Sequence, residues 1–209
     1  MVQAGKTNSY AIANISARII SDNRMLETGE GEHAFGGGGI YVNGYSSDYP
    51  GFHNGVLNLA NALITENTAA LEGGGYAACP VSSTEMYLNN GAAIFGNTGD
   101  RANDIYILAS LDYGVHSGNP FYTVASTMLG GTPYHWKDEQ GNEVSLNHLK
   151  GQLNFFSNDY ELVLSTDVKQ DAAAKELAAV VISGNTSATR GGGIGSNGTV
   201  NIGARIPVN

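Results

Sequence analysis

Residues 180–194, VVISGNTSATRGGGI, decide the fold: a β-branched run, an asparagine followed by threonine, a polar stretch, a glycine cluster and an apolar residue. A similar order recurs in three earlier copies, although threonine follows the asparagine in only two of these three. The apolar runs are 18–20, 62–64, 92–94 and 180–182, and the asparagines are Asn23, Asn67, Asn97 and Asn185. Such short runs separated by turns predict strands and fit no helical period. The 30-residue spacing from Asn67 to Asn97 is typical of a solenoid coil of short strands.

The repeat predicts an all-β parallel β-helix in which equivalent turns stack. Nine residues separate the asparagine from the residue after the corner in the last three copies, which makes Tyr76, Tyr106 and Ile194 equivalent. Stacked asparagines can satisfy buried backbone groups and hydrogen-bond one another, so we expect a structural asparagine ladder. Glycine clusters allow the sharp corners. The third copy has Asn103 and Asp104 there instead, so glycine is preferred rather than required.

These motifs resemble the repeat of polymorphic outer-membrane-type proteins, which also occurs in large adhesin-like surface proteins of Gram-positive gut bacteria. The resemblance covers residues about 15–108 and 180–203, and its motifs are short. It implies a right-handed parallel β-helix, in a chain that commonly continues into stalk domains and a wall anchor. The family commonly has phenylalanine where Ile20, Ile64, Ile94 and Ile182 stand.

Composition excludes several classes of protein. The chain has 209 residues with 29 glycines, a net charge of −9 and no apolar run long enough to span a membrane. An acidic chain with scattered Lys and Arg argues against nucleic-acid binding. Its single cysteine, Cys79, cannot form an internal disulfide and is expected to be buried and inert. The N-terminus does not read as a signal peptide. No cofactor is expected.

Residues 109–179 break the repeat, within a single domain spanning residues 1–209. This insert is rich in aromatic residues and is expected to pack on the solenoid or cap it. It contains a predicted strand at 162–164, a turn at 137–143 and a short helix at 171–179. Its aromatic side chains either form a small core or, at Tyr134, His135 and Trp136, present an exposed platform for a sugar ring.

Other chemistry is weighed at three places. The loops at 25–33 and 44–54 contain His33 and His53, which are candidate metal ligands together with Asp48 or Glu32. Exposed histidines are more often solvated, so no metal is expected. Asp100 and Arg101 are interpreted as a surface ion pair, and Asp104 as a turn residue that accepts hydrogen bonds from backbone amides. No catalytic residue is expected.

The sequence therefore predicts a non-catalytic structural or adhesive module of a secreted, surface-anchored bacterial protein, located at the cell surface, with its signal peptide and anchor outside this chain. Its partners would be a host or bacterial surface glycan or protein, and flanking domains of the same chain, without membrane insertion by this part. The alternative is a carbohydrate-binding or polysaccharide-active β-helix. A third hypothesis is self-association through an open end, with residues 200–202 as the last strand.

Overall fold

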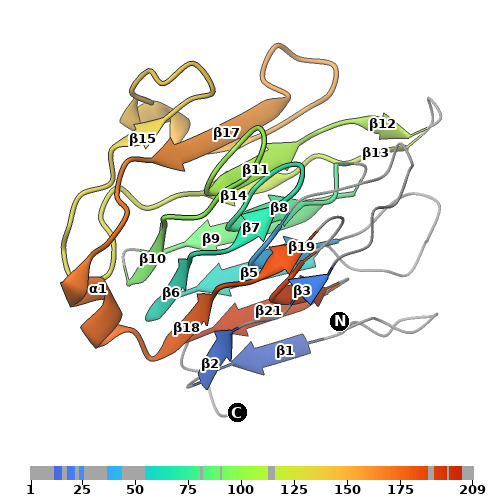
Figure 1. Cartoon of the computed structure of the whole chain (residues 1–209). Helices are drawn as coiled ribbons and strands as arrows, with labels where there is room; N and C mark the ends of the chain where they lie inside the picture. The colour runs from blue at the N-terminus through green and yellow to red at the C-terminus, as the bar shows by residue number, and fades with distance from the viewer. Residues whose placement is uncertain are drawn as a thin grey trace, which may run out of the picture.

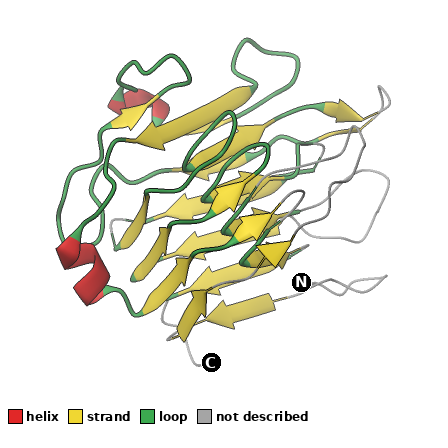
Figure 2. Ribbon diagram, viewed as in Figure 1, coloured by secondary structure: helices red, strands yellow, loops and turns green. Residues whose placement is uncertain are grey.

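The computed structural model describes residues 12–15, 18–21, 24–25, 37–43, 55–80, 82–89, 91–112, 116–187, 191–196 and 198–203. Strands dominate, stacked from β1 and β2 at one end to β15 and β17 at the other (Figure 1). One α-helix, α1 (Ala172–Leu177), and one 3₁₀ turn, η1 (Leu146–His148), interrupt them (Figure 2). Within the described ranges no helix is long and apolar enough to cross a membrane.

The repeated apolar runs form the first sheet. Its strands, in spatial order, are β10 (Ala92–Phe95), β6 (Ala62–Thr65), β18 (Val180–Ser183) and β2 (Arg18–Ser21). All of them pair in parallel, and Ile94, Ile64 and Ile182 lie opposite one another in register. These three side chains are buried in the main hydrophobic core. The predicted strands and their stacking are therefore confirmed.

The second sheet follows the glycine corners. Its order is β15 (Trp136–Lys137), β17 (Glu161–Thr166), β11 (Ile105–Leu108), β8 (Tyr76–Ala78), β4 (Ile40–Val42) and β20 (Ile194–Ser196). Gly73 has a φ of +62°, and a Cβ on Gly74 would lie 2.4 Å from the backbone oxygen of Thr98. The first position needs left-handed backbone and the second leaves no room for a side chain, so both positions of this corner require glycine.

The corner of the third copy is one residue shorter than its spacing predicts. Tyr76 pairs with Ile105 rather than with Tyr106. Asp104 therefore lies opposite Gly75, and not opposite Gly74 as the residue count suggests. In this register the side chain of Asp104 points into the buried row of asparagines described below.

The third large sheet has six strands. Its order is β1 (Ile12–Ile15), β21 (Thr199–Ile202), β5 (Gly55–Leu59), β9 (Thr84–Leu88), β14 (Phe121–Thr123) and β16 (Lys150–Gln152). A small parallel sheet holds β3 (Arg24–Met25), β19 (Thr186–Ser187) and β7 (Thr68–Ala69), and a two-stranded one holds β12 (Leu111–Asp112) and β13 (His116–Ser117). Buried and half-buried residues alternate along β5 and β9, which places one face against the core.

The expected single right-handed parallel β-helix is wrong, because the sheets are mixed. β17 runs antiparallel to both β11 and β15, and β16 runs antiparallel to β14. Strand order also departs from chain order, since β18 lies between β6 and β2 and β21 lies between β5 and β1. The antiparallel strands all involve residues 109–179, where the chain returns through loops instead of continuing the 30-residue repeat.

Residues 109–179 lie at the end of the stack formed by β9, β10 and β11. β14 pairs with β9, and β17 pairs with β11. Over β10, the Tyr134 hydroxyl accepts a hydrogen bond from the Ile94 amide at 2.9 Å. The predicted strand at 162–164 lies within β17, and the predicted helix is α1, whose first turn is capped by the Asp171 carboxylate accepting from the Ala174 amide at 2.8 Å.

Candidate functional site

A buried row of amides runs across the parallel strands at the turns after β18, β6 and β10. The Asn185 side-chain amide donates to Asn67 Oδ1 at 2.6 Å, and that of Asn67 donates to Asn97 Oδ1 at 2.9 Å. The same oxygens also accept from backbone amides, from Asn185 N at 3.0 Å and from Asn67 N at 3.1 Å. The side chains of Asn67 and Asn97 thus each satisfy a buried backbone amide of the neighbouring turn. Asn23, the fourth predicted member, lies outside the described residues.

Asp104 ends this row with a carboxylate. Asn97 donates to Asp104 Oδ1 from its side-chain amide at 3.0 Å and from its backbone amide at 3.4 Å, while Thr166 N donates to Oδ2 at 2.8 Å. The interpretation of Asp104 as an acceptor for backbone amides is therefore confirmed. Burial raises the pKa of Asp104 to about 7, although these three donors lower it. All four side chains have structural partners and are closed to solvent.

The cluster of Tyr134, His135 and Trp136 does not form an exposed platform. The rings of Tyr134 and Trp136 stack with centroids 4.3 Å apart, and both side chains are buried. Trp136 Nε1 donates to the Ala125 carbonyl at 3.0 Å. His135 points to solvent, with Nδ1 3.2 Å from Glu143 Oε1. These two rings belong to the core between the insert and the stacked strands, which confirms the prediction of a small core and corrects the alternative of a sugar platform here.

Arg101 has partners that the sequence did not suggest. Its guanidinium lies 3.2 Å from Glu139 Oε1 and 2.7 Å from Glu161 Oε1, and it packs over the ring of Tyr106. The expected surface pair with Asp100 is replaced by these contacts, because the insert brings two carboxylates to the corner. Arg101 thereby joins the third copy of the repeat to the insert.

The remaining candidates add no chemistry to this region. Cys79 is buried, as expected. His33, His53, Glu32 and Asp48 lie outside the described residues. Within the described ranges, no group of three or more His, Cys, Asp or Glu side chains is arranged to hold a metal ion.

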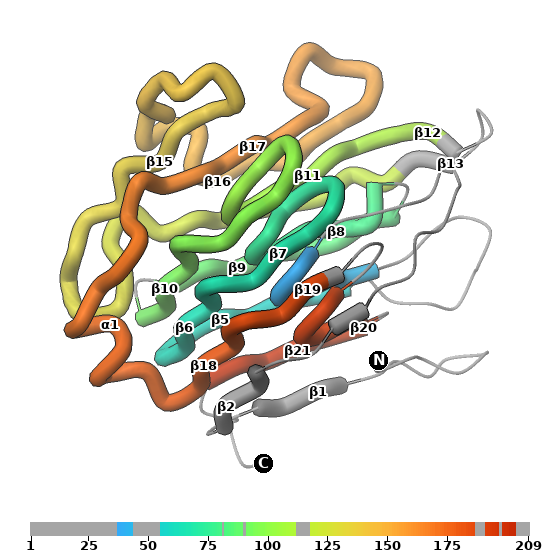
Figure 3. The backbone as a smooth tube through the Cα atoms, viewed as in Figure 1, coloured from blue at the N-terminus to red at the C-terminus, as the bar shows by residue number. Residues whose placement is uncertain are grey.

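A hollow of about 470 Å³ lies between two loops of the insert and β17. The loops, residues 138–148 and 154–160, project from the same end of the molecule on either side of β17 (Figure 3). Hydrophobic residues form part of the wall: Val144, Leu162, Val163 and Leu164. Five carboxylates also line it, and no Lys or Arg does: Asp138, Glu139, Glu143, Asp159 and Glu161. Its volume is in the range of small-molecule sites.

Four of these carboxylates already have partners. Asp138 accepts from the backbone amides of Gln140 and Asn142, at 3.0 and 2.8 Å, and so holds its own turn. Arg101 binds the carboxylates at positions 139 and 161, and His135 contacts the one at 143, as described above. These groups shape the hollow and make it negative.

Two lining groups have no hydrogen-bond partner among the described residues: the Tyr122 hydroxyl and the Asp159 carboxylate. Tyr122 is only 2 % exposed and lines the hollow, whereas Asp159 is exposed at its margin. Burial, and secondly the charge of Asp159, raises the pKa of Tyr122, so its hydroxyl remains protonated at neutral pH. The hollow therefore offers an unused phenol and an unused carboxylate to a ligand.

The same two loops carry most of the large exposed hydrophobic side chains of the described residues. Leu146 is 72 % exposed and Phe156 is 79 % exposed, and Phe155 and Tyr160 are also exposed. The rings of Phe155 and Phe156 meet edge to face, with centroids 5.3 Å apart. Leu177 on α1 is the other large hydrophobic side chain exposed in the described part of the chain. Exposed apolar side chains such as the adjacent Phe155 and Phe156, on a loop that borders a hollow, are typical of a binding surface.

Comparison with known proteins found no matching family model, no similar curated protein and no similar solved structure. The resemblance to surface-protein repeats therefore stays a prediction from short motifs.

Sequence reasoning missed Tyr122, Asp159 and Phe156 as candidate functional residues. Each lies in the aromatic-rich insert, whose composition drew attention to the region but not to these positions. Tyr122 is part of β14, while the other two lie in the loop before β17. The loop could have been identified from its polar residues between two strands, together with the two adjacent phenylalanines at 155 and 156.

Proposed function

We propose that this chain is a non-catalytic adhesive module of a secreted, surface-anchored bacterial protein, and that its ligand binds at the two loops of residues 138–148 and 154–160. The observation that carries the proposal is the exposure of Leu146, Phe155, Phe156 and Tyr160 on the two loops that border the hollow. Surface residues of this type supply much of the energy of recognition when a partner covers them.

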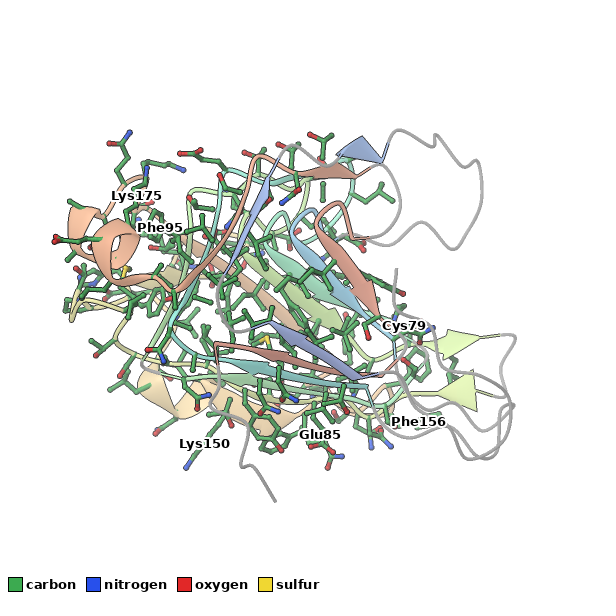
Figure 4. All side chains as sticks on the ribbon, turned by 90° about the horizontal axis from the view of Figure 1, so that it is seen from below. Cys79, Glu85, Phe95, Lys150, Phe156 and Lys175 are labelled. Atoms are coloured by element: carbon green, nitrogen blue, oxygen red, sulfur yellow. The ribbon has the colours of Figure 1, made fainter. Side chains whose placement is uncertain are left out.

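The rest of the molecule supports a scaffold role. Stacked parallel strands, joined by the buried row Asn185, Asn67, Asn97 and Asp104, hold the base on which the insert rests. Most carboxylates of the hollow are occupied by structural contacts, which favours binding over acid–base chemistry. Figure 4 labels Phe156 in the loop before β17, and shows Lys175 pointing outward from α1, at a distance from that loop.

The alternative is a carbohydrate-binding module. Since the rings of Tyr134 and Trp136 are buried, a sugar would have to stack on Phe156 or Tyr160. An array of neutral, amino and acidic glycans, probed with the full chain and with Phe156→Ser, separates this alternative from binding to a protein surface.

The adhesive proposal is tested with beads that carry the full chain, incubated with epithelial cells and with bacterial cells. We expect attachment to fall in the double variant Leu146→Ser/Phe156→Ser and to persist in the matched control Leu177→Ser. All three positions are exposed, so each change should leave stability within about 0.5 kcal/mol. Equal attachment by wild type, double variant and control would contradict the proposal.

A further inference from the structure

We propose that the hollow between residues 138–148, 154–160 and β17 binds an organic cation, an alkylammonium or alkylguanidinium group on an apolar stem. This inference rests on the proposed function, because it names the ligand class for the same site. The charged group would lie beside Asp159 and Tyr122, and the stem would pack along the apolar wall at Val144 and Leu162.

Charge decides between ligand classes. The hollow is lined by five carboxylates and by no Lys or Arg, and Arg101 neutralises only part of this charge from outside the lining. An anionic ligand such as a phosphate, sulfate or uronic acid would be repelled there, and a cation would be attracted.

Hydrogen-bonding capacity points to the same class. Tyr122 is 2 % exposed, and its hydroxyl faces the hollow without a partner among the described residues. The hydroxyl oxygen is not among the fully buried atoms without a partner, so a ligand in the hollow can reach it and supply that partner. The phenol oxygen and the Asp159 carboxylate can both accept, and an ammonium or guanidinium group carries only donors, so both acceptors are matched by one group.

The exposed rings fit the same chemistry. Phe155, Phe156 and Tyr160 stand in the loop that carries Asp159. Cations are attracted to the faces of aromatic rings, and this attraction adds to the ion pair at a partly exposed site. The stem of a lysine side chain or of a polyamine is long enough to use the apolar wall while its charge stays at the margin.

The test uses the full chain and isothermal titration at low salt. Three probes separate the sources of the cation: spermine as a free polyamine, a short peptide with a central lysine and blocked ends, and the same peptide with arginine. Maltotriose serves as the neutral hydroxyl-rich probe. We expect at least one cationic probe to bind, with an affinity that falls as salt is raised, and maltotriose not to bind.

Variants locate the binding. Asp159→Asn and Tyr122→Phe should each weaken binding of the cationic probe about three- to tenfold, because each removes one acceptor of a charged donor. Glu176→Gln is the matched control, since it removes an exposed carboxylate on α1, away from the hollow. Thermal melting of each variant checks that the fold is intact, and Tyr122→Phe keeps the buried ring.

Several results would overturn the inference. One is a loss of affinity in Glu176→Gln equal to that in Asp159→Asn, which would mean diffuse attraction to an acidic protein. Others are binding of maltotriose, or of no probe at all. Cell attachment that survives Asp159→Asn and Tyr122→Phe but not Leu146→Ser/Phe156→Ser would leave the adhesive function standing and remove only the cation site.

Discussion

Replacing Asn67 with alanine should destabilise the protein strongly, because this residue is the middle of the buried amide row. The change deprives three groups of a hydrogen-bond partner: the backbone and side-chain amides of Asn185, bonded to Asn67 Oδ1, and the Ile182 carbonyl, bonded to Asn67 Nδ2 at 3.0 Å. A buried group that loses its partner costs about 1–3 kcal/mol, and neighbouring losses are not fully additive. We therefore expect a loss of about 3–6 kcal/mol, a large part of the ~5–15 kcal/mol typical of a folded protein.

The assay is urea unfolding followed by circular dichroism, with the free energy of unfolding extrapolated to water. Asn58→Ala is the matched control, since Asn58 lies half-buried on β5 and donates one side-chain bond, to Asn201 Oδ1 at 2.8 Å. It should cost about 1 kcal/mol. For a chain of this size, Asn67→Ala should lower the melting temperature by about 10 °C or more, and Asn58→Ala by about 3 °C. Equal losses in the two variants would refute the reasoning that the row is buried and continuous.

Three further perturbations test other parts of the structure. The pKa of Asp104 is raised to about 7 from its ordinary 3.8, so the folded state binds the carboxyl proton more tightly than the unfolded state does, and the free energy of unfolding should fall by up to about 4 kcal/mol as pH rises from 4 to 8. Urea unfolding across this range should show a weaker pH dependence of stability in Asp104→Asn, and an unchanged pH dependence would contradict the assignment. Gly74→Ala places a Cβ 2.4 Å from a backbone oxygen and should lower the free energy of unfolding by about 2–4 kcal/mol. Gly141→Ala, at a φ of +83° with open space around it, should lower it by about 1 kcal/mol, and thermal unfolding of the two variants compares these losses. Arg101→Gln removes both ion pairs to the insert and should speed amide hydrogen exchange in the insert. Because the guanidinium is partly exposed, the free energy of global unfolding should change by less than about 1 kcal/mol. Faster exchange throughout the described strands would argue against a local role.

The repeat could be predicted from sequence because its determinants are local. β-branched runs give the strands, and the residues at Gly73 and Gly74 reflect backbone geometry that no other residue tolerates. The asparagines follow from the same logic, since a buried turn must satisfy its own backbone groups. The role of Asp104 as an acceptor was predictable in kind, but the one-residue shift that points it at Asn97 was not, because register depends on strand pairing.

The structure of the insert was harder to predict from sequence, because it depends on contacts between residues far apart in the chain. Tyr134 and Trp136 look like candidates for an exposed platform in sequence, yet each finds a backbone partner that allows its burial, on Ile94 and Ala125 respectively. The antiparallel direction of β17 is set by the loops that return the chain, and periodicity does not report direction. The hollow joins residues from 122 to 164, so no single stretch of sequence carries its pattern.

The order of strands also has a consequence for biosynthesis. β1 pairs with β21, and β2 with β18, so the first strands of the chain find their neighbours in residues 180–202, synthesised more than 150 residues later. A ribosome that has translated β5 to β11 has released a segment able to pair with itself, while the strands that emerged first still wait for theirs. We therefore expect folding to begin with the pairing of β5 to β11, and β1 and β2 to join only after β18 and β21, which lie between them and that part.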